Sequence, residues 1–278
     1  AALQSKIGTA RLLHGLMGSP VVPEGALAGP AYPLSVSGTA FAIEIGARVR
    51  DAQGRPLAPV DVVLETDSRR PEAKHAILEM YAEHGYEFPD TPTMALHRGR
   101  IDLLEVHLRR DPGLLRRTFA HQEIYPPDLG CHDEINATQG TPLKGTTLLH
   151  LCADYDETEI ARWLLERGMD VDAAAAVDAA GFGGHTALFG TVVSQPNFWV
   201  NYGSGRPDEA PLTRLLLDHG ANPNARGTLR KRLHPGYDDH RVCEVRDVTP
   251  LGWGERFHGR LFVSATAMRL IAERGGHR

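Results

Sequence analysis

The same helix ending occurs several times along this chain, and that recurrence limits the folds it can adopt. In TRLLLDHGANPNARG (213–227), leucines at helical spacing stop at His219, and Gly-Ala-Asn-Pro-Asn follows. Related endings are ARWLLERGMDVDA (161–173), AMRLIAERGGH (267–277), AILEMYAEHGYEFPD (76–90) and the weaker LLEVHLRRDPGLL (103–115). The apolar stripe buries one helix face, and the next glycine takes the left-handed conformation that other residues resist. The recurrence therefore predicts a repeated helical unit.

A second short motif precedes these endings. It reads GTTLLH at 145–150, HTAL at 185–188, VTPL at 248–251 and TPTMALH at 91–97. A threonine hydroxyl caps the first helix of such a unit, and proline suits the first helical turn. Together with the glycine ending, the motif resembles the ankyrin repeat, whose pattern is Thr-Pro-Leu-His-x-Ala, a Gly turn, a Leu-Leu helix and Gly-Ala-Asp/Asn-Pro-Asn. In that family the histidine, here His97 and His150, bonds backbone and ties neighbouring loops together.

The resemblance predicts an all-α fold, an ankyrin-repeat solenoid of about five helix-turn-helix units with long loop insertions and an atypical N-terminal cap. Residues 1–55 are expected to form the helical cap with a Pro/Gly-rich loop, and residues 56–278 the ankyrin-repeat domain. Terminal units must cover the apolar faces of an array, so a degraded N-terminal pattern is expected. Within the cap we expect a helix at 3–17, a loop at 20–33 and a degenerate first unit at 34–51.

The spacing of the units indicates insertions. The glycines that end helices are Gly85, Gly168, Gly220 and Gly275. With one further unit ending near Asp111, the later intervals exceed the ankyrin period by roughly twenty residues. The excess predicts insertions at 116–145, 194–211 and 226–247. In the third, residues 229–234 and 241–246 are expected to pair as a hairpin, and aromatic residues in all three argue against disorder.

Composition and charge narrow the classes of partner and compartment. The net charge is -5 and the pI about 6.3, and acidic residues interleave the basic segments, so nucleic acid is not expected as a partner. No apolar run is long enough to span a bilayer, so no membrane association is predicted. Three widely spaced cysteines without a C-x-x-C motif fit a reducing compartment, and we expect a cytoplasmic location. The chain begins with alanine, which leaves open the removal of an earlier segment.

Catalytic and cofactor motifs were also sought in the sequence. No G-x-S-x-G, P-loop or Rossmann fingerprint occurs, so the sequence predicts a protein that is not an enzyme and has no cofactor. The densest set of possible metal ligands lies in AHQEIYPPDLGCHDE (120–134) and comprises His121, Glu123, Asp128, Cys131, His132, Asp133 and Glu134. The candidates among them are His121, His132, Asp133 and Glu134. These residues lack a recognised ligand spacing, and we therefore favour charged groups that cap helices and bond backbone over a metal site.

The resemblance also implies a function. Ankyrin arrays, as a family, bind proteins through the concave face of the inner helices and through the finger loops, so we expect a protein-binding module of unknown partner and oligomeric state. The chain further resembles a bacterial ankyrin-repeat family with long inserted loops and no assigned activity. The expected contact residues are Tyr125, Tyr155, Phe198, Trp199, Arg230, Arg232, Tyr237 and Trp253. The alternative is that these rings pack against the repeats and only seal long loops.

Two other functions remain alternatives. One is an enzyme, small-ligand or metal-binding protein with a site formed by the inserted loops, which requires a set of polar side chains to meet in one pocket. That set comprises His121, His132, Asp133, Glu134, His185 and His240. The other is a structural accessory region of a longer polypeptide.

Overall fold

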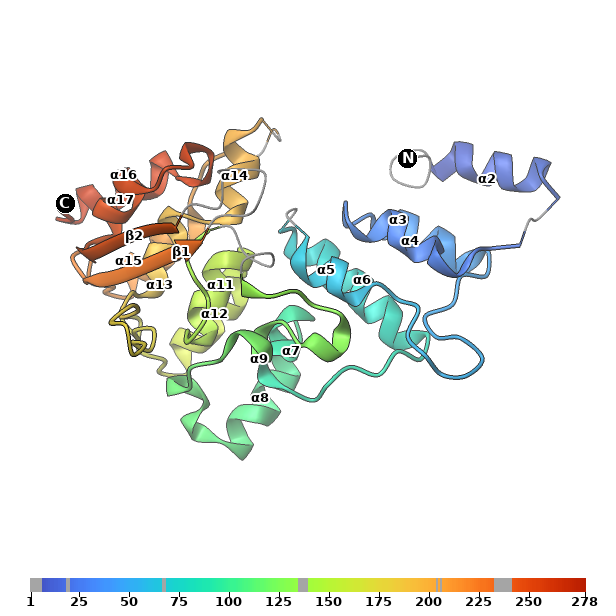
Figure 1. The fold of residues 1–278 in the computed structure, drawn as a ribbon, viewed down its shortest axis with the longest axis horizontal. Helices are drawn as coiled ribbons and strands as arrows, with labels where there is room; N and C mark the ends of the chain where they lie inside the picture. The colour runs from blue at the N-terminus through green and yellow to red at the C-terminus, as the bar shows by residue number, and fades with distance from the viewer. Residues whose placement is uncertain are drawn as a thin grey trace.

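Helices packed in successive pairs make up most of the described chain. The computed structural model describes residues 7–18, 21–66, 69–134, 140–203, 205, 207–232 and 242–278. The pairs are α5 (Val60–Glu65) with α6 (Pro71–Glu83), α7 (Pro92–His97) with α8 (Ile101–Arg110), α11 (Leu148–Tyr155) with α12 (Thr158–Glu166), α13 (Ala187–Val192) with α15 (Pro211–Asp218), and α16 (Pro250–Arg256) with α17 (Ala265–Glu273). Figure 1 shows them following one another, with α16 and α17 at one end of the molecule and the N-terminal helices at the other.

The helix boundaries follow from the repeated motifs. The Thr91 hydroxyl accepts a hydrogen bond from the Met94 amide and caps α7, and the Thr249 hydroxyl caps α16 in the same way through Gly252. At the other ends, four glycines have φ between 82° and 90°, which confirms the predicted left-handed caps: Gly85, Gly168, Gly220 and Gly275.

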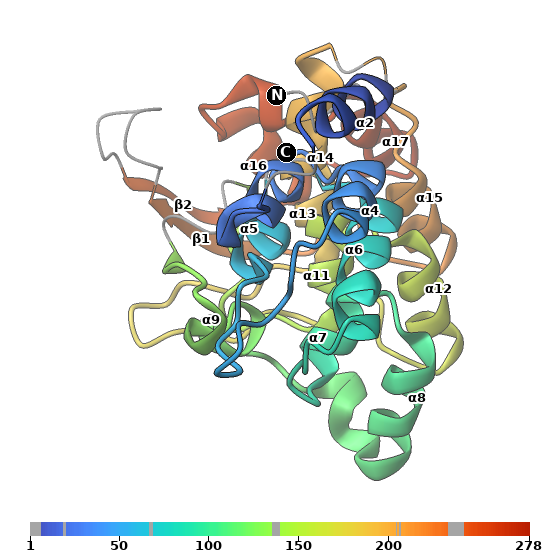
Figure 2. The ribbon, with the colours of Figure 1, turned by 90° about the vertical axis from the view of Figure 1, so that its right-hand side faces the viewer.

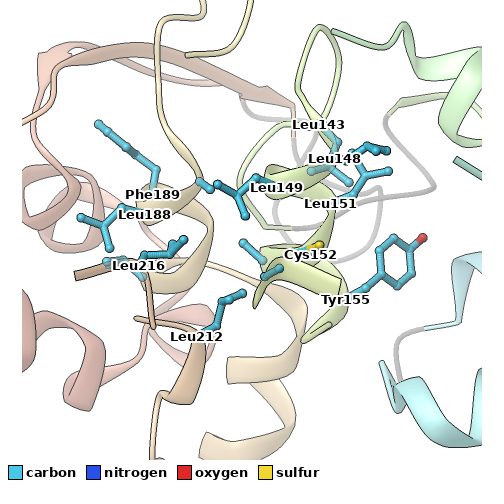
Figure 3. Packing of buried hydrophobic residues seen from close by; sticks show 14 of the residues in the cluster. Leu143, Leu148, Leu149, Leu151, Cys152, Tyr155, Leu188, Phe189, Leu212 and Leu216 are labelled. Atoms are coloured by element: carbon cyan, nitrogen blue, oxygen red, sulfur yellow. The ribbon is translucent and has the colours of Figure 1, made fainter. Parts of the chain in front are cut away.

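The units stack in two rows of helices. The inner helix α11 packs against α13, which packs against α16, and the outer helix α12 packs against α15, which packs against α17. Figure 3 shows Leu149 and Cys152 of α11 facing Leu188 of α13 and Leu212 of α15 in this core. Cys152 is completely buried, as expected for a cysteine that packs as a small apolar residue. Burial of these apolar surfaces stabilises the stack.

The inserted segments carry secondary structure of their own. After η2 (Pro112–Arg116), the first contains α9 (His121–Ile124) and η3 (Pro127–Leu129), and the second contains α14 (Gln195–Asn201) between the two helices of its unit. The third forms β1 (Gly227–Arg232) and β2 (Val242–Val248), which pair as the predicted antiparallel hairpin. The hairpin adds two strands to a mostly helical fold, and Leu229 and Val245 of the hairpin are buried. The predicted turn at 235–239 lies outside the described residues.

The N-terminal region contains α2 (Ile7–Leu16), η1 (Glu24–Leu27), α3 (Ala28–Ala31) and α4 (Val36–Glu44). The prediction of a loop throughout 20–33 is wrong, because Leu27 and Ala31 are buried there as part of η1 and α3. These residues share a core cluster with Val63 and Leu78 of the first helix pair. None of the described helices is long and apolar enough to cross a membrane.

Buried apolar residues form two core clusters. One contains residues between 27 and 94, and the other contains residues between 95 and 271. Cys131, in the first insertion, packs against both clusters. The boundary between the clusters is also where most of the large buried charged side chains lie, as described below.

Candidate binding site

The segments that join successive units form a layer held by backbone hydrogen bonds, which we call the finger layer. It comprises residues 117–120, 140–147, 174–186, 226–232 and 242–248. The Phe119 amide donates to the Thr146 carbonyl oxygen (2.8 Å), and the Ala176 amide donates to the Gly145 carbonyl oxygen (2.7 Å). Gly183 and Thr228 exchange two hydrogen bonds of 2.7 and 2.9 Å. Adjacent fingers are therefore tied to one another and hold a fixed relative position.

Buried histidines attach the inner helices to the segments beside them. His150 Nε2 lies 3.0 Å from the carbonyl oxygen of His185 in the finger layer, and His97 Nε2 lies 2.9 Å from the carbonyl oxygen of Ile124 in α9 (His121–Ile124). The loop-tying role that the ankyrin resemblance implies for His97 and His150 is thus confirmed. Burial, followed by the charge of His185, lowers the pKa of His150 to about 3, so the ring is neutral near pH 7.

The finger layer encloses a cavity of about 500 Å³. Its walls are residues 133–134 of the first insertion, 142–145 before α11, 176–178 and 182–185 before α13, and 228–231 of β1. Figure 2 shows the β1–β2 hairpin and α9 on one side of the molecule, with the outer helices α8, α12 and α15 on the opposite side. The cavity therefore joins segments that precede three successive units, and the first and third insertions both contribute to it.

The cavity carries apolar surface and charges of both signs. The guanidinium carbon of Arg230 lies 3.7 Å from the Phe182 ring centroid, and Arg230 Nε donates to a Glu244 carboxylate oxygen at 2.7 Å. Lys231 is buried, and burial lowers its pKa to about 8 although the nearby carboxylates of Glu134 and Asp154 act in the opposite direction. The walls thus present fixed, oriented side chains rather than a uniform charge.

Three of the predicted contact residues are buried, which corrects their assignment to an exposed surface. Tyr125, Tyr155 and Trp253 are at most 1% exposed. Their polar tips have partners inside the protein, which explains how they can be buried. The Tyr155 hydroxyl donates to the Leu64 carbonyl oxygen (2.8 Å) and contacts the Tyr125 hydroxyl (2.5 Å), while Trp253 Nε1 donates to Thr141 Oγ1 (2.9 Å). These rings pack down on the repeats, as the alternative interpretation required.

Phe198 and Trp199 lie half-buried on α14, which is anchored to η4 (Arg260–Phe262). The Asn201 side-chain amide donates to the carbonyl oxygens of Leu261 and Val263, at 2.8 Å each. Tyr202, which was not among the predicted residues, stacks on Phe198 with ring centroids 5.5 Å apart and is 67% exposed. The spacing of four between Phe198 and Tyr202 was the available signal, because it places both rings on one helix face.

The remaining predicted contacts lie on or near the hairpin. Arg230 is exposed and lines the cavity. Arg232 belongs to β1, but its side chain is outside the described part of the structure, as is Tyr237.

The possible metal ligands of the first insertion do not gather around one point. His121 Nε2 lies 2.9 Å from the His132 carbonyl oxygen, whereas the His132 ring pairs with the Glu65 carboxylate of α5. Asp133 and Glu134 line the cavity instead. Within the described ranges, no group of three His, Cys, Asp or Glu side chains is placed to hold a metal ion. Of the pocket set proposed for an enzyme, His185 also lines the cavity, whereas His240 lies outside the described residues.

A group of buried charges connects the two core clusters, and no local sequence pattern predicts it. Arg69 pairs with Asp154 (3.1 Å), and Lys74 pairs with Glu157 (2.9 Å). All four side chains are buried. Lys74 Nζ also lies 4.0 Å from the Tyr155 ring centroid. This group, which we call the charged seam, fixes α6 and the segment before it against the end of α11 and the start of α12.

The comparisons with known proteins agree with the paired helices. A family model of the ankyrin repeat matches residues 144–176, which include α11 and α12. No similar sequence was found among curated proteins.

Among solved structures, the chain is similar to an ankyrin repeat domain from Acinetobacter baumannii AYE (19% identity, TM-score 0.36), over 92% of this chain and 100% of that chain. It is also similar to the ankyrin repeat domain of human ASB11 (17% identity, TM-score 0.38), over 100% of this chain and 99% of that one. The ankyrin repeat domain of Bcl-3, described as a unique member of the IkappaB family, has 15% identity and a TM-score of 0.32, with 98% of this chain and 96% of that chain covered. The family model thus identifies an ankyrin repeat at residues 144–176, which is one of the stacked helix pairs of this chain.

Proposed function

We propose that this chain is a protein-binding module whose contact surface is the finger layer, with the cavity at its centre. The observation that supports this is the construction of the cavity from segments that precede three successive units. Backbone hydrogen bonds between the fingers fix the walls before a partner arrives. A preformed surface loses little conformational entropy on binding, which favours recognition of another protein. Ankyrin-repeat proteins generally act as binding modules of this kind rather than as enzymes.

The proposal includes a division of the chain into units. We assign the five described helix pairs from α5 to α17 as five ankyrin units, preceded by an atypical cap at 1–55. The insertions at 116–145, 194–211 and 226–247 are then elaborations of the array. The first and third supply walls of the cavity, and the second supplies α14.

A second part of the contact surface is the aromatic face of α14, formed by Phe198, Trp199 and Tyr202. Two interactions support this assignment: the stacking of Tyr202 on Phe198 and the anchoring of α14 through Asn201. Aromatic side chains held in one conformation bury large areas on binding at a low entropic cost. Of the predicted contact residues, the proposal retains Phe198, Trp199 and Arg230, to which it adds Tyr202; Arg232 and Tyr237 also stay predictions.

The proposal places the protein in the cytoplasm and includes neither nucleic acid nor membrane among its partners. The three cysteines are free thiols, which fits a reducing compartment. A structural role as an accessory region of a longer polypeptide is compatible with the same surface, because such a region would also bind protein.

Site-specific photo-crosslinking in cells tests the proposal. A photoreactive amino acid is placed at Val177, which lines the cavity and is 64% exposed. The matched control is Leu12 on α2, which is 63% exposed and distant in sequence from the finger layer. We expect a discrete protein adduct from position 177 and none from position 12. The absence of an adduct at 177, or the same adduct at both positions, would overturn the finger layer as the binding surface.

A further inference from the structure

The structure assigns a binding mode to the cavity, and this inference rests on the proposed function. We propose that the cavity takes an extended polypeptide segment of the partner, which pairs with the open edge of β1 as an additional strand. The segment carries an apolar side chain that contacts Val177 and Phe182 and an acidic side chain that faces Lys144.

The open edge of β1 follows from its hydrogen bonding. Thr228 directs both its amide and its carbonyl group away from β2, since both bond to Gly183. Successive residues of a strand direct these groups to opposite edges, so Leu229 and Lys231 face β2, and Arg230 faces the same side as Thr228. The register, which pairs Leu229 with Val245 and Lys231 with Cys243, agrees with this alternation. Among the residues that the structure describes, none outside the hairpin forms a backbone hydrogen bond with Arg230.

The cavity extends along this same edge. Its walls include β1 from Thr228 to Lys231, together with Glu134, Pro142 and Lys144 of the first insertion. The short contact between Gly183 and Thr228 closes one end, because Gly183 already occupies the position that an added strand would take. A segment entering the cavity therefore meets the amide and carbonyl of Arg230 next to this closed end. A strand edge with unmade hydrogen bonds is a template for pairing with another chain.

The side chains around the cavity specify the occupant further. Val177 is 64% exposed although it borders a cavity, so an apolar side chain gains buried area there; Phe182 lines the same cavity, but its ring is already covered by Arg230 and Arg246. Lys144 is largely exposed, and its ammonium nitrogen lies 3.9 Å from a Glu134 carboxylate oxygen. Arg230, in contrast, is neutralised by Glu244 at 2.7 Å. Lys144 is thus a cation of this wall that an acidic side chain of the partner can reach.

The test uses a matched pair of variants, Arg230→Pro and Arg230→Ala. Both lose the contacts of the Arg230 side chain with Phe182 and Glu244, but only proline removes the amide that faces the cavity. Proline is tolerated on an edge strand when its nitrogen faces away from the neighbouring strand, so the hairpin is expected to persist. Random peptides of about ten residues, long enough for a strand, are displayed and selected on the wild-type chain. We expect the selected peptides to bind Arg230→Pro at least about tenfold more weakly than Arg230→Ala.

N-methylation of a selected peptide gives a second measurement that does not depend on the stability of either variant. Each peptide amide is methylated in turn, and binding to the wild-type chain is measured. Strand addition predicts loss of binding at alternate positions, because alternate amides face β1. Uniform tolerance, uniform loss, or equal affinity for Arg230→Pro and Arg230→Ala would each overturn the strand-addition mode. Failure to select any peptide would overturn it as well, whereas a crosslinked protein at Val177 would still support the proposed function.

Discussion

Lys74 Nζ lies 2.9 Å from Glu157 Oε1, although both side chains are almost completely buried. The two residues come from different core clusters, since Lys74 belongs to α6 and Glu157 is the N-cap of α12. His75 Nε2 contacts the same carboxylate oxygen at 2.8 Å. A buried charge without a partner is strongly destabilising, so the charged seam favours only the docked arrangement of the two clusters.

The seam predicts a non-additive response to mutation. Glu157→Gln leaves the Lys74 ammonium group buried without its counter-charge, and we expect a loss of about 3–5 kcal/mol in the free energy of unfolding. Lys74→Met in the same background removes the isolated charge and is expected to recover a large part of that loss. The measurement is urea-induced unfolding followed by far-UV circular dichroism. A double variant as unstable as the sum of the single losses would show that the ion pair contributes nothing.

Acid is expected to destabilise the finger layer through its buried histidines. Burial lowers the pKa of His150 to about 3 and that of His185 to about 4, both below the ordinary value of 6.5. Because each ring has a lower pKa in the folded than in the unfolded protein, its protonation favours unfolding. The free energy of unfolding is therefore highest above pH 6.5 and decreases as the pH falls toward the folded-state pKa. At pH 5 the loss is about 2 kcal/mol for each ring, since each pKa unit corresponds to about 1.4 kcal/mol.

The check on this prediction is the unfolding midpoint in urea at pH 7.5 and pH 5. His150→Gln removes one titrating ring and keeps an amide that donates a hydrogen bond. We expect this variant to be less stable at pH 7.5 but to lose less stability between the two values. If the wild type and the variant lose the same amount, His150 does not account for the acid sensitivity.

Much of the fold could be predicted because its signals are local. The glycine after each leucine stripe, the threonine caps and the alternating pattern of the third insertion each depend on residues within one element. The predicted helix endings and hairpin are accordingly found, and so are the loop contacts of His97 and His150.

The errors and omissions concern contacts between distant residues. Lys74 and Glu157 are 83 positions apart, and nothing near either residue indicates that the other will neutralise it. Tyr155 was expected on an exposed face because the residues next to it in the sequence do not show that Leu64 and Tyr125 will form hydrogen bonds with its hydroxyl. The cavity likewise depends on how the fingers of three successive units come together, which the spacing of the motifs does not determine.

Alanine substitutions at two glycines of one finger distinguish the energetic cost of backbone strain from that of a steric clash. Gly183 has φ of +134°, and an added Cβ would lie 2.1 Å from the Ala176 carbonyl oxygen. Gly181 has φ of +81°, but an added Cβ would meet nothing within 4 Å. We expect Gly181→Ala to cost about 1–2 kcal/mol, the ordinary penalty of the left-handed region. Gly183→Ala should cost more, because the finger must move and its paired bonds with Thr228 are disturbed.

Thermal unfolding and amide exchange in β1 measure the two effects. Gly183→Ala is expected to lower the melting temperature further than Gly181→Ala and to increase exchange at Thr228 specifically. Equal melting temperatures with an unchanged Thr228 amide would mean that the finger accommodates the methyl group without loss of the bridge.

The position of α14 is expected to depend on Asn197. Its side-chain amide lies within 3.1–3.2 Å of the carbonyl oxygens of Thr191, Val192 and Phe262, so this residue of α14 connects α13 with η4. Asn197→Ala leaves these partly buried acceptors without that donor, at a cost of about 1–3 kcal/mol. We expect faster hydrogen exchange in α14 and η4, measured by mass spectrometry, while α11 keeps its protection.

Tyr202→Ala serves as the control, because it removes an exposed ring from the same helix end and none of these hydrogen bonds. If both variants increase exchange in η4 equally, loss of the Phe198–Tyr202 stack rather than loss of the Asn197 hydrogen bonds accounts for the loosening.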